Sequence, residues 1–477
     1  MKKLYLVILV LAAQASFLAL PQPGAQTPAA AGRANRPNIL FILADDMGSE
    51  ASPIYPDLYN ASAPNGHGQA ATPTLSALAS RGIVFDNAWA TPLCSPTRGA
   101  ILSGLYGHNT GVTTVGNILP GSTTSIFELM SASTQTPHYN MAVFGKWHLA
   151  GSVAGPNGMD HVVKETGVPL FKGFLGSHIT NYYNWTLDSS AAASSNTTTY
   201  STTLLTDFAI DFIRKQNASA PWFLYLPYNA PHGTAPSDGF QVPPAGMFSV
   251  DVGARPAGAP TVYNGAAAIP VYQAIIQSLD KEIGRLFKAM DEAGQMNNTV
   301  IIFMGDNGTP ASVKDSAARI RGSKQGVYEG GVRVPLIVAG PGVTRKGREA
   351  HLVSATDIYA TISDLAGMPL TNNSINNSYS IVPLLSKDQA TTGRKYSFTE
   401  LCANTGAGVK QFAIRDQRYK LLYNGSAWEM FDLEKDPWEA TNLIVPGTGT
   451  RAALLAELRT LRMKAATSGC FVDIPAQ

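Results

Sequence analysis

The segment Asn38-Ile39-Leu40-Phe41-Ile42-Leu43-Ala44-Asp45-Asp46 indicates the fold class of the chain. It starts after Pro37 with a continuous apolar run of strand length, and it ends at two adjacent aspartates. A strand this apolar fits a sheet that is covered on both faces, as parallel sheets are. In open α/β sheets ligands bind outside the carboxyl ends of the strands, so Asp45 and Asp46 stand where a site is expected.

Similar apolar runs alternate with helical patterns as far as about residue 370. The runs are residues 141–144, 222–226, 300–304 and 334–338. Between them, residues 272–290 place apolar side chains three and four positions apart, which predicts a helix with one apolar stripe. Strands that alternate with helices predict an α/β fold with a large mixed, mostly parallel sheet sandwiched by helices.

The pattern changes after about residue 385. Two short runs, residues 412–415 and 419–423, flank Asp416-Gln417 and predict a hairpin. A further strand is expected over residues 428–433, and an amphipathic helix over residues 452–463. We therefore expect a smaller C-terminal α+β domain on an antiparallel sheet over residues 386–477, after an α/β domain over residues 36–385. The Gly/Pro/Ala-rich residues 231–270 are expected to form a long functional loop.

The composition excludes some classes of partner. The chain has 477 residues, is 45% hydrophobic and 14% charged, and has a net charge of +2. No basic excess points to nucleic acid, so an anion must be held by a few placed cations. Lys2 and Lys3 precede the apolar residues 4–20, and we expect residues 1–31 to be a signal peptide and linker, with a membrane anchor as the alternative. The expected location is periplasmic or extracellular, without stable membrane association.

The three cysteines are an odd number for an exported protein. Cys402 and Cys470 both lie near the C-terminus and are able to pair, which would leave Cys94 as a free thiol.

Two strand ends carry oxygen ligands. Asp45 and Asp46 follow the first strand, and Asp306-Asn307 follows residues 300–304. Four oxygen ligands without His or Cys favour Ca²⁺ or Mg²⁺ over Zn²⁺. The alternative is that each pair forms a turn or caps a helix, because Asp and Asn favour both positions.

The segment Leu93-Cys94-Ser95-Pro96-Thr97-Arg98-Gly99 resembles the signature of the type I, formylglycine-dependent sulfatases, whose core is Cys-x-Pro-x-Arg. Further segments match elements of that family in the same order along the chain, from about residue 37 to 443. These segments are Gly145-Lys146-Trp147-His148, Ala230-Pro231-His232, Arg321-Gly322-Ser323-Lys324, and Asp436-Pro437-Trp438-Glu439 with Asn442-Leu443.

The resemblance implies an alkaline-phosphatase-like fold and a catalytic role for residues 36–385. In the family, a maturation enzyme oxidises the signature Cys to an aldehyde, formylglycine, which hydrates to a geminal diol. The resemblance thus implies that Cys94 is converted in this way and that one Ca²⁺ per chain is bound by Asp45, Asp46, Asp306, Asn307 and the residue at position 94. The cation would make a diol oxygen a better nucleophile toward a sulfate monoester.

The resemblance also implies a role for each basic residue of the site. Arg98 would stabilise the diol, and Lys146 and Lys324 would hold the sulfate oxygens. His232 would protonate the leaving oxygen, and His148 would take the proton that releases sulfate from a covalent sulfo-enzyme. The substrate would be an aryl sulfate or a sulfated carbohydrate.

Two other functions stay open on the sequence. One is a phosphonate or phosphate monoester hydrolase of the same fold, and the other is a non-catalytic binder of sulfated glycans with unmodified Cys94. His108 and His178 are weaker candidates for the pocket, and several aromatic side chains are candidates for stacking on a substrate ring: Tyr55, Tyr59, Tyr182, Tyr183 and Trp185.

Overall fold

The computed structural model describes residues 36–151, 156–234, 239–253, 261–370, 377–387, 390–402, 410–444, 452–454 and 456–457. Residues 1–31, Cys470 and most of the expected helix over 452–463 lie outside the described residues, so the predictions for them stay predictions. Residues 452–454 and 456–457 are helical. Cys94 is free, whereas Cys402 is disulfide-bonded.

β1 (Asn38–Ala44) lies inside a ten-stranded sheet and pairs in parallel with β10 (Thr299–Gly305) and β7 (Trp222–Pro227). The register places Ala44 opposite Gly305 and Leu43 opposite Pro227, so these three strands end at the same edge. Asp45, Asp306 and the segment that leads to His232 therefore start side by side.

The sheet has the order β12-β2-β11-β10-β1-β7-β3-β4-β5-β6. Its other strands are β2 (Ile83–Trp89), β3 (Asn140–Lys146), β4 (Phe171–Phe174), β5 (Trp185–Ser189), β6 (Ser195–Thr197), β11 (Leu336–Ala339) and β12 (Gly347–Ser354). β11 is antiparallel to both neighbours, and β5 is antiparallel to β4 and β6, so the sheet is mixed, as predicted.

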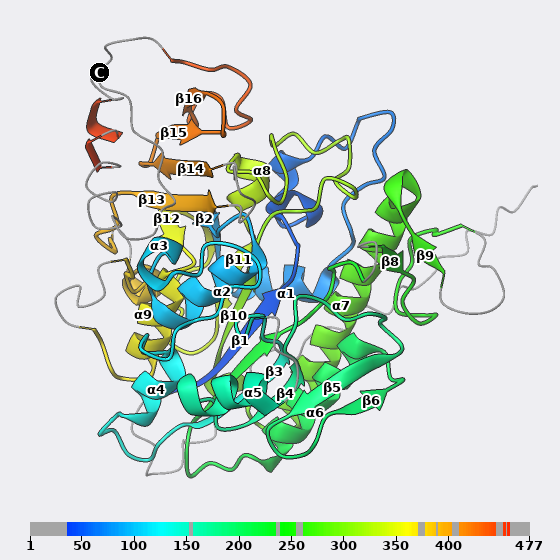
Figure 1. Cartoon of the computed structure of the whole chain (residues 1–477), viewed down its shortest axis with the longest axis vertical. Helices are drawn as coiled ribbons and strands as arrows, with labels where there is room; N and C mark the ends of the chain where they lie inside the picture. The colour runs from blue at the N-terminus through cyan, green and yellow to red at the C-terminus, as the bar shows by residue number, and fades with distance from the viewer. Residues whose placement is uncertain are drawn as a thin grey trace, which may run out of the picture.

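Helices cover both faces of this sheet (Figure 1). The side chains of β1 alternate between two apolar cores: Leu40 and Ile42 belong to one, and Ile39, Phe41 and Leu43 to the other. The first core includes side chains of α1 (Pro73–Arg81), α6 (Ser201–Lys215) and α7 (Ala268–Glu292). The second includes side chains of α2 (Cys94–Ser103), α4 (Ile126–Ser131) and α9 (Asp357–Leu365). Burial on both faces explains why β1 is apolar at every position.

The predicted helix over 272–290 is confirmed as part of α7, but the expected loop over 231–270 is too long. α7 begins at Ala268 and carries Pro270 in its first turn, where proline costs no hydrogen bond. The described part of that loop also contains a small hairpin of β8 (Phe240–Gln241) and β9 (Val262–Tyr263). The remaining short helices are α3 (Gly107–Thr110), α5 (Pro156–Asp160), α8 (Glu329–Val332) and α10 (Val382–Ser386).

A separate antiparallel sheet follows, with the strand order β13-β14-β15-β16. The predicted hairpin is β14 (Lys410–Arg415) and β15 (Tyr419–Tyr423), and the further strand is β16 (Trp428–Asp432). The sequence analysis missed β13 (Ser397–Cys402). Figure 1 shows this sheet at one end of the molecule, next to β12, β2 and α8. The predicted fold class is confirmed, whereas the boundary between residues 385 and 386 stays a prediction.

Among the described residues, no helix has both the length and the apolar character needed to cross a bilayer.

Candidate active site

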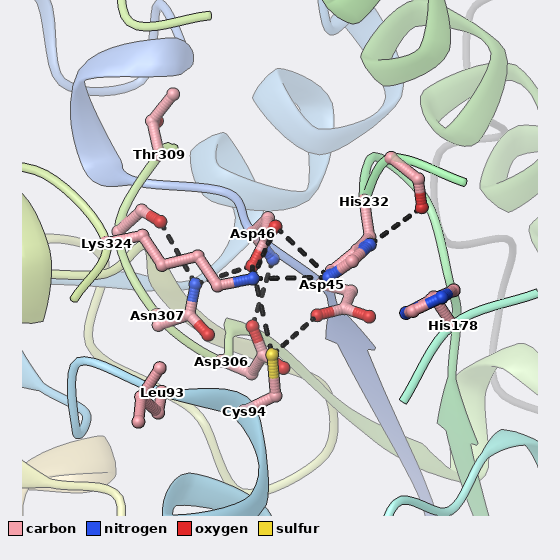
Figure 2. A network of polar contacts seen from close by, with 12 residues as sticks. Asp45, Asp46, Leu93, Cys94, His178, His232, Asp306, Asn307, Thr309 and Lys324 are labelled. Carbon is pink, nitrogen blue, oxygen red and sulfur yellow. Dashed lines mark hydrogen bonds and ion pairs between the residues drawn. The ribbon is translucent and has the colours of Figure 1, made fainter. Parts of the chain in front are cut away.

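The candidate active site lies at the carboxyl ends of β1, β3, β7 and β10, where chain segments far apart in sequence meet (Figure 2). The structure brings together all the side chains that the sequence analysis singled out for chemistry. All are buried except Lys324, whose side chain is 13% exposed. They are Asp45, Asp46, Cys94, Arg98, Lys146, His148, His232, Asp306, Asn307 and Lys324.

Asp46 occupies a left-handed turn directly after β1, with φ of 67°. Asp is one of the few residues that tolerate this conformation. The Asp46 amide donates to Asp306 Oδ1 at 3.0 Å, and Asn307 Nδ2 donates to Asp46 Oδ1 at 2.7 Å. These contacts fix the two strand ends to each other and direct both aspartates of the pair into one pocket.

Cys94 is the first residue of α2 and is 1% exposed. Its Sγ lies 3.4 Å from Asp45 Oδ1 and 3.9 Å from Asp46 Oδ1. Burial, followed by the charge of Asp45, raises the pKa of the Cys94 thiol well above its usual range. The thiol is therefore protonated at neutral pH, and an unmodified Cys94 is a poor nucleophile.

Arg98 lies one turn along α2 and is fully buried. One guanidinium nitrogen donates to Lys146 O at 2.8 Å, and another donates to Asp306 Oδ2 at 2.8 Å. The first helical turn of the Cys94 segment is thus tied to the ends of β3 and β10, because one side chain bridges both.

Two lysines face the aspartate pair from opposite parts of the chain. Lys146 Nζ, at the end of β3, donates to Asp45 Oδ2 at 2.6 Å, and Lys324 Nζ lies 2.7 Å from Asp46 Oδ1. Gly145 precedes Lys146 with φ of 137°, and a Cβ there would stand 1.9 Å from Pro227 O. A glycine is therefore required for β3 to pass β7 closely enough to present Lys146.

The two histidines differ in their partners. His232 Nδ1 lies 2.7 Å from Gly233 O, which leaves Nε2 facing Lys324 Nζ at 3.2 Å. Burial lowers the pKa of His232 to about 3, with Asp46 opposing and Lys324 adding to the shift. Within the described residues neither ring nitrogen of His148 has a hydrogen-bond partner, and burial and then Lys146 lower its pKa. Both histidines are therefore neutral in the free protein.

Several buried side chains of the site are able to hold a cation, and the Asp and Asn oxygens among them are the donors that a hard divalent cation prefers. Asp45, Asp46, Cys94 and His232 offer ligand atoms within 4.8 Å of one another. Asn307 Oδ1 is buried and has no hydrogen-bond partner among the described residues, although its Nδ2 donates twice. Buried polar atoms are rarely left unpaired. The carboxylates of Asp45, Asp46 and Asp306, by contrast, each accept hydrogen bonds through both oxygens.

The crowding of carboxylates supports the same conclusion. Burial, and then the charge of Asp45, raises the pKa of Asp306 to about 7. Carboxylates that resist ionising together are a favourable setting for a cation with oxygen ligands.

The secondary candidates of the sequence analysis separate clearly. The His178 ring stacks on that of His232 with centroids 5.9 Å apart, so it belongs to the pocket, as Figure 2 shows. His108 instead pairs with Glu400 at 3.0 Å. Four of the five aromatic candidates for stacking are buried and expose little ring surface to a substrate: Tyr55, Tyr59, Tyr182 and Trp185.

Sequence reasoning missed several side chains that support the site. Tyr272 OH donates to Asp46 O at 2.7 Å, and Tyr182 OH donates to His232 O at 2.7 Å. Thr309 accepts from Gly48 N through its hydroxyl and from Lys324 N through its carbonyl. Tyr272 looked like one more member of the apolar stripe of α7, and nothing in the sequence signals the target of its hydroxyl.

Comparisons with known proteins agree with this geometry. Residues 37–368 match the family model described as Sulfatase, and residues 323–464 match the one described as N-sulphoglucosamine sulphohydrolase, C-terminal. A protein named Sulfatase from Formosa agariphila is 27% identical, covering 88% of this chain and 87% of the relative. An N-acetylglucosamine-6-O-sulfatase from Bacteroides thetaiotaomicron is 24% identical, covering 86% of this chain and 82% of the relative.

Solved structures share the fold. The crystal structure of Ps i-CgsB in complex with k-i-k-neocarrahexaose superposes with a TM-score of 0.73 at 23% identity, covering 92% of this chain and 95% of that one. The structure of BT4656 in complex with its substrate D-Glucosamine-2-N, 6-O-disulfate gives a TM-score of 0.69 at 20% identity, covering 91% of this chain and 99% of that one.

Proposed function

This chain belongs to the sulfatase family and is a sulfuric ester hydrolase, and we propose that it cleaves sulfate monoesters of carbohydrates at a formylglycine made from Cys94. The observation that carries the proposal is the position of Cys94 Sγ, 3.4 Å from Asp45 and 3.9 Å from Asp46. Each of these aspartates in turn holds one lysine ammonium. The precursor of the proposed nucleophile, the proposed cation ligands and two lysine ammonium groups therefore share one buried pocket.

The cofactor and the modification would each supply one element of the chemistry. Formylglycine hydrate would supply the attacking oxygen, and Ca²⁺ would lower the cost of its deprotonation. The residues proposed to hold the cation are Asp45, Asp46, Asp306, Asn307 and the modified residue 94. Asn307 Oδ1 is the best supported of these ligands, because it is buried and no described residue hydrogen-bonds to it.

Lys146 and Lys324 bind the sulfate group in this proposal. Their ammonium groups flank the aspartate pair from β3 and from the segment after β10, so a sulfate between them has both sides held. Fixed cations orient the ester for attack and offset the charge that shifts during transfer. Arg98 orients residue 94 through its links to Lys146 O and Asp306.

The two histidines divide the proton transfers. His232 Nε2 faces the pocket while Nδ1 is held by Gly233 O, which orients it to give a proton to the leaving oxygen. Binding of an anionic sulfate next to His232 favours its protonated form. His148 has ring nitrogens with no described protein partner and a lowered pKa, which suits a base that takes a proton from residue 94 during sulfate release.

The carbohydrate substrate class is inferred from the relatives. The Bacteroides relative is named for N-acetylglucosamine 6-O-sulfate, and two fold neighbours were solved with sugar ligands. The burial of four of the five candidate aromatics leaves Tyr183 as the partly exposed ring for a planar contact. With so little exposed aromatic surface, we expect an aryl sulfate to react because its phenolate is a good leaving group and not because its ring is recognised.

Two further elements of the proposal concern processing. A maturation enzyme is required to convert Cys94, and residues 1–31 are proposed to direct export to the periplasm or the exterior. We also propose that residues 36–385 and 386–477 are the two structural domains.

The test is turnover of matched esters by purified protein that has been produced together with a maturation enzyme. A sulfated monosaccharide and an aryl sulfate should both be hydrolysed, and the aryl phosphonate of the same phenol should react far more slowly. Cys94→Ala is the matched control and should hydrolyse none of them. Faster turnover of the phosphonate would favour the phosphonate hydrolase, and binding of sulfated glycans without turnover would favour the non-catalytic binder.

A further inference from the structure

The segment that carries Lys324 is held in place by the C-terminal sheet. We name residues 321–333 the Lys324 loop. On the side of the active site, Lys324 N donates to Thr309 O at 2.9 Å, and Gln325 N donates to Pro92 O at 3.0 Å. The loop closes on itself where Gly330 N donates to Arg321 O at 2.7 Å. These bonds fix the backbone on which the Lys324 ammonium depends.

The other side of the Lys324 loop packs on the C-terminal sheet, and Figure 1 shows α8 beside β14. A distinct apolar core forms there, made of the loop residues Val327 and Val332 and of Trp89, Ala413, Leu422 and Phe431. Strands β14, β15 and β16 each contribute one of these side chains. The loop therefore lies between the sulfate pocket and the second sheet.

A buried group of charges joins the same two parts. Lys420 Nζ, on β15, lies 3.1 Å from Glu329 Oε1 and 2.8 Å from Glu439 Oε1. Glu439 Oε2 accepts the backbone N–H of Glu329 at 2.7 Å, and Trp89 Nε1 donates to Glu329 Oε1 at 3.1 Å. Lys420 and Glu439 are 0% exposed and Glu329 is 1% exposed.

Burial of ionisable side chains such as these, to which Arg415 adds a further ion pair with Glu329 at 3.8 Å, is a poor way to gain stability. Removing them from water costs several kcal/mol per ion, and well-packed apolar side chains often replace such groups without loss. Their geometry is instead specific: Glu439, with φ of 61°, accepts a hydrogen bond from the backbone at the start of α8 and forms an ion pair with Lys420 of β15. Such a network specifies one position of α8 relative to the sheet.

A second contact reaches the start of the Lys324 loop. Arg321, three residues before Lys324, donates to Glu429 Oε2 at 2.9 Å and to Glu439 O at 3.2 Å. Its guanidinium also lies over the Tyr328 ring, 4.1 Å from the centroid. Glu439 thus contacts both ends of the segment that presents Lys324, through its carbonyl at Arg321 and through its carboxylate at Glu329.

We propose that Glu439 and Lys420 are positioning residues for sulfate binding, through which the C-terminal sheet determines where the Lys324 ammonium stands. The inference rests on the proposed role of Lys324 in holding sulfate. Lys324 Nζ has short contacts with Asp46 and His232, so a small shift of the loop changes its distance from a bound sulfate. The C-terminal sheet is then a functional part of the sulfate site, although none of its residues lies in the pocket.

The test compares two buried glutamates at the junction with this sheet. Glu439→Gln replaces one carboxylate oxygen with an NH2 group, so the side chain can no longer face both Lys420 and the backbone N–H of Glu329 with oxygen atoms. Glu400→Gln is the matched control: Glu400 lies on β13, is 3% exposed and binds His108, without a described contact to the Lys324 loop. The readouts are the inhibition constant of inorganic sulfate, KM and kcat for an aryl sulfate, and the melting temperature.

We expect Glu439→Gln to raise both the sulfate inhibition constant and KM by about tenfold, as displacement of a binding group does. Glu400→Gln should leave the sulfate inhibition constant and KM within about twofold of the wild type, because distant sites without shared partners act independently. This should hold even if Glu400→Gln lowers the melting temperature as much as Glu439→Gln does. Unchanged sulfate inhibition in Glu439→Gln would overturn the inference, and so would an equal loss in Glu400→Gln.

A second pair of variants decides the question if Glu439→Gln does not fold. Arg321 and Arg418 have similarly exposed side chains, 43% and 39%, and each binds an acidic residue of β16. Arg321→Met should weaken sulfate inhibition, whereas Arg418→Met should not. Lys324→Ala serves as the reference. If this variant binds sulfate as the wild type does, the proposed role of Lys324 fails. If Lys324→Ala weakens sulfate binding but the Glu439 and Arg321 variants do not, only the positioning role fails.

Discussion

Loss of His232 should depend strongly on the leaving group. In His232→Ala the pocket loses the Nε2 that lies 3.2 Å from Lys324 Nζ, and with it the proton source for the leaving oxygen. His232 is 6% exposed, so water has little access to replace the ring. For a sugar alcohol, which leaves poorly without a proton, the loss should be about 100- to 10,000-fold in kcat/KM, or about 3–5 kcal/mol of transition-state stabilisation.

A nitrophenol leaves without a proton, so its turnover by His232→Ala should fall far less. His148→Ala is the informative partner, because His148 is proposed to act after the leaving group has gone. It should release leaving group in a burst and then turn over slowly, whichever ester is used. His232→Ala should show no burst with a sugar sulfate.

The assay is rapid-mixing kinetics with a nitrophenyl sulfate and a sulfated sugar, with calcium content checked for each variant. Calcium must match the wild type, because His232 lies within 3.5 Å of Asp46. Equal losses for both variants with both esters would refute the division of labour, even though the protein would still be a sulfatase.

Three further predictions concern other parts of the molecule. Cys94→Ala should abolish turnover and change the melting temperature by only a few degrees, because a small buried side chain becomes slightly smaller; near-normal turnover would exclude a mechanism based on residue 94. Asp280 accepts the backbone N–H groups of Thr74 and Leu75 at 2.9 and 2.8 Å, and burial raises its pKa to about 6. An acid whose pKa is raised in the folded state lowers the free energy of unfolding as pH rises from about 4 to about 6, here by about 3 kcal/mol. The free energy of unfolding of Asp280→Asn, measured with urea, should therefore change less with pH over that range. The same pH dependence in the variant and the wild type would contradict the raised pKa of Asp280. Peptide mapping without reductant should recover Cys402 linked to Cys470, and recovery of both as free thiols would contradict the pairing.

The sequence predicted that carboxylates from two apolar runs meet, because they lie at strand ends. Asp45 and Asp306 follow apolar runs, and parallel strands bring such ends together without further information. The other members of the candidate site, Lys146 among them, were expected from the family resemblance, and their chemical roles stay proposals. The start of a helix fixes the spacing of Cys94 and Arg98.

What escaped prediction depends on contacts between distant side chains. The hydroxyl of Tyr272 and the carboxylate of Glu439 carry no local signal, because each acts on a backbone group far away in sequence. The choice among the aromatic candidates for stacking was out of reach for the same reason: the burial of Tyr55 and Tyr182 is decided by tertiary packing, which aromatic residue type alone does not reveal.

The most direct test of the central claim is the mass of the peptide that contains residue 94, measured on protein of known specific activity. Active protein should carry an aldehyde there, with one oxygen in place of one sulfur and two hydrogens, and activity should rise in proportion to the converted fraction. Full sulfatase activity in protein whose Cys94 is entirely unmodified would contradict it.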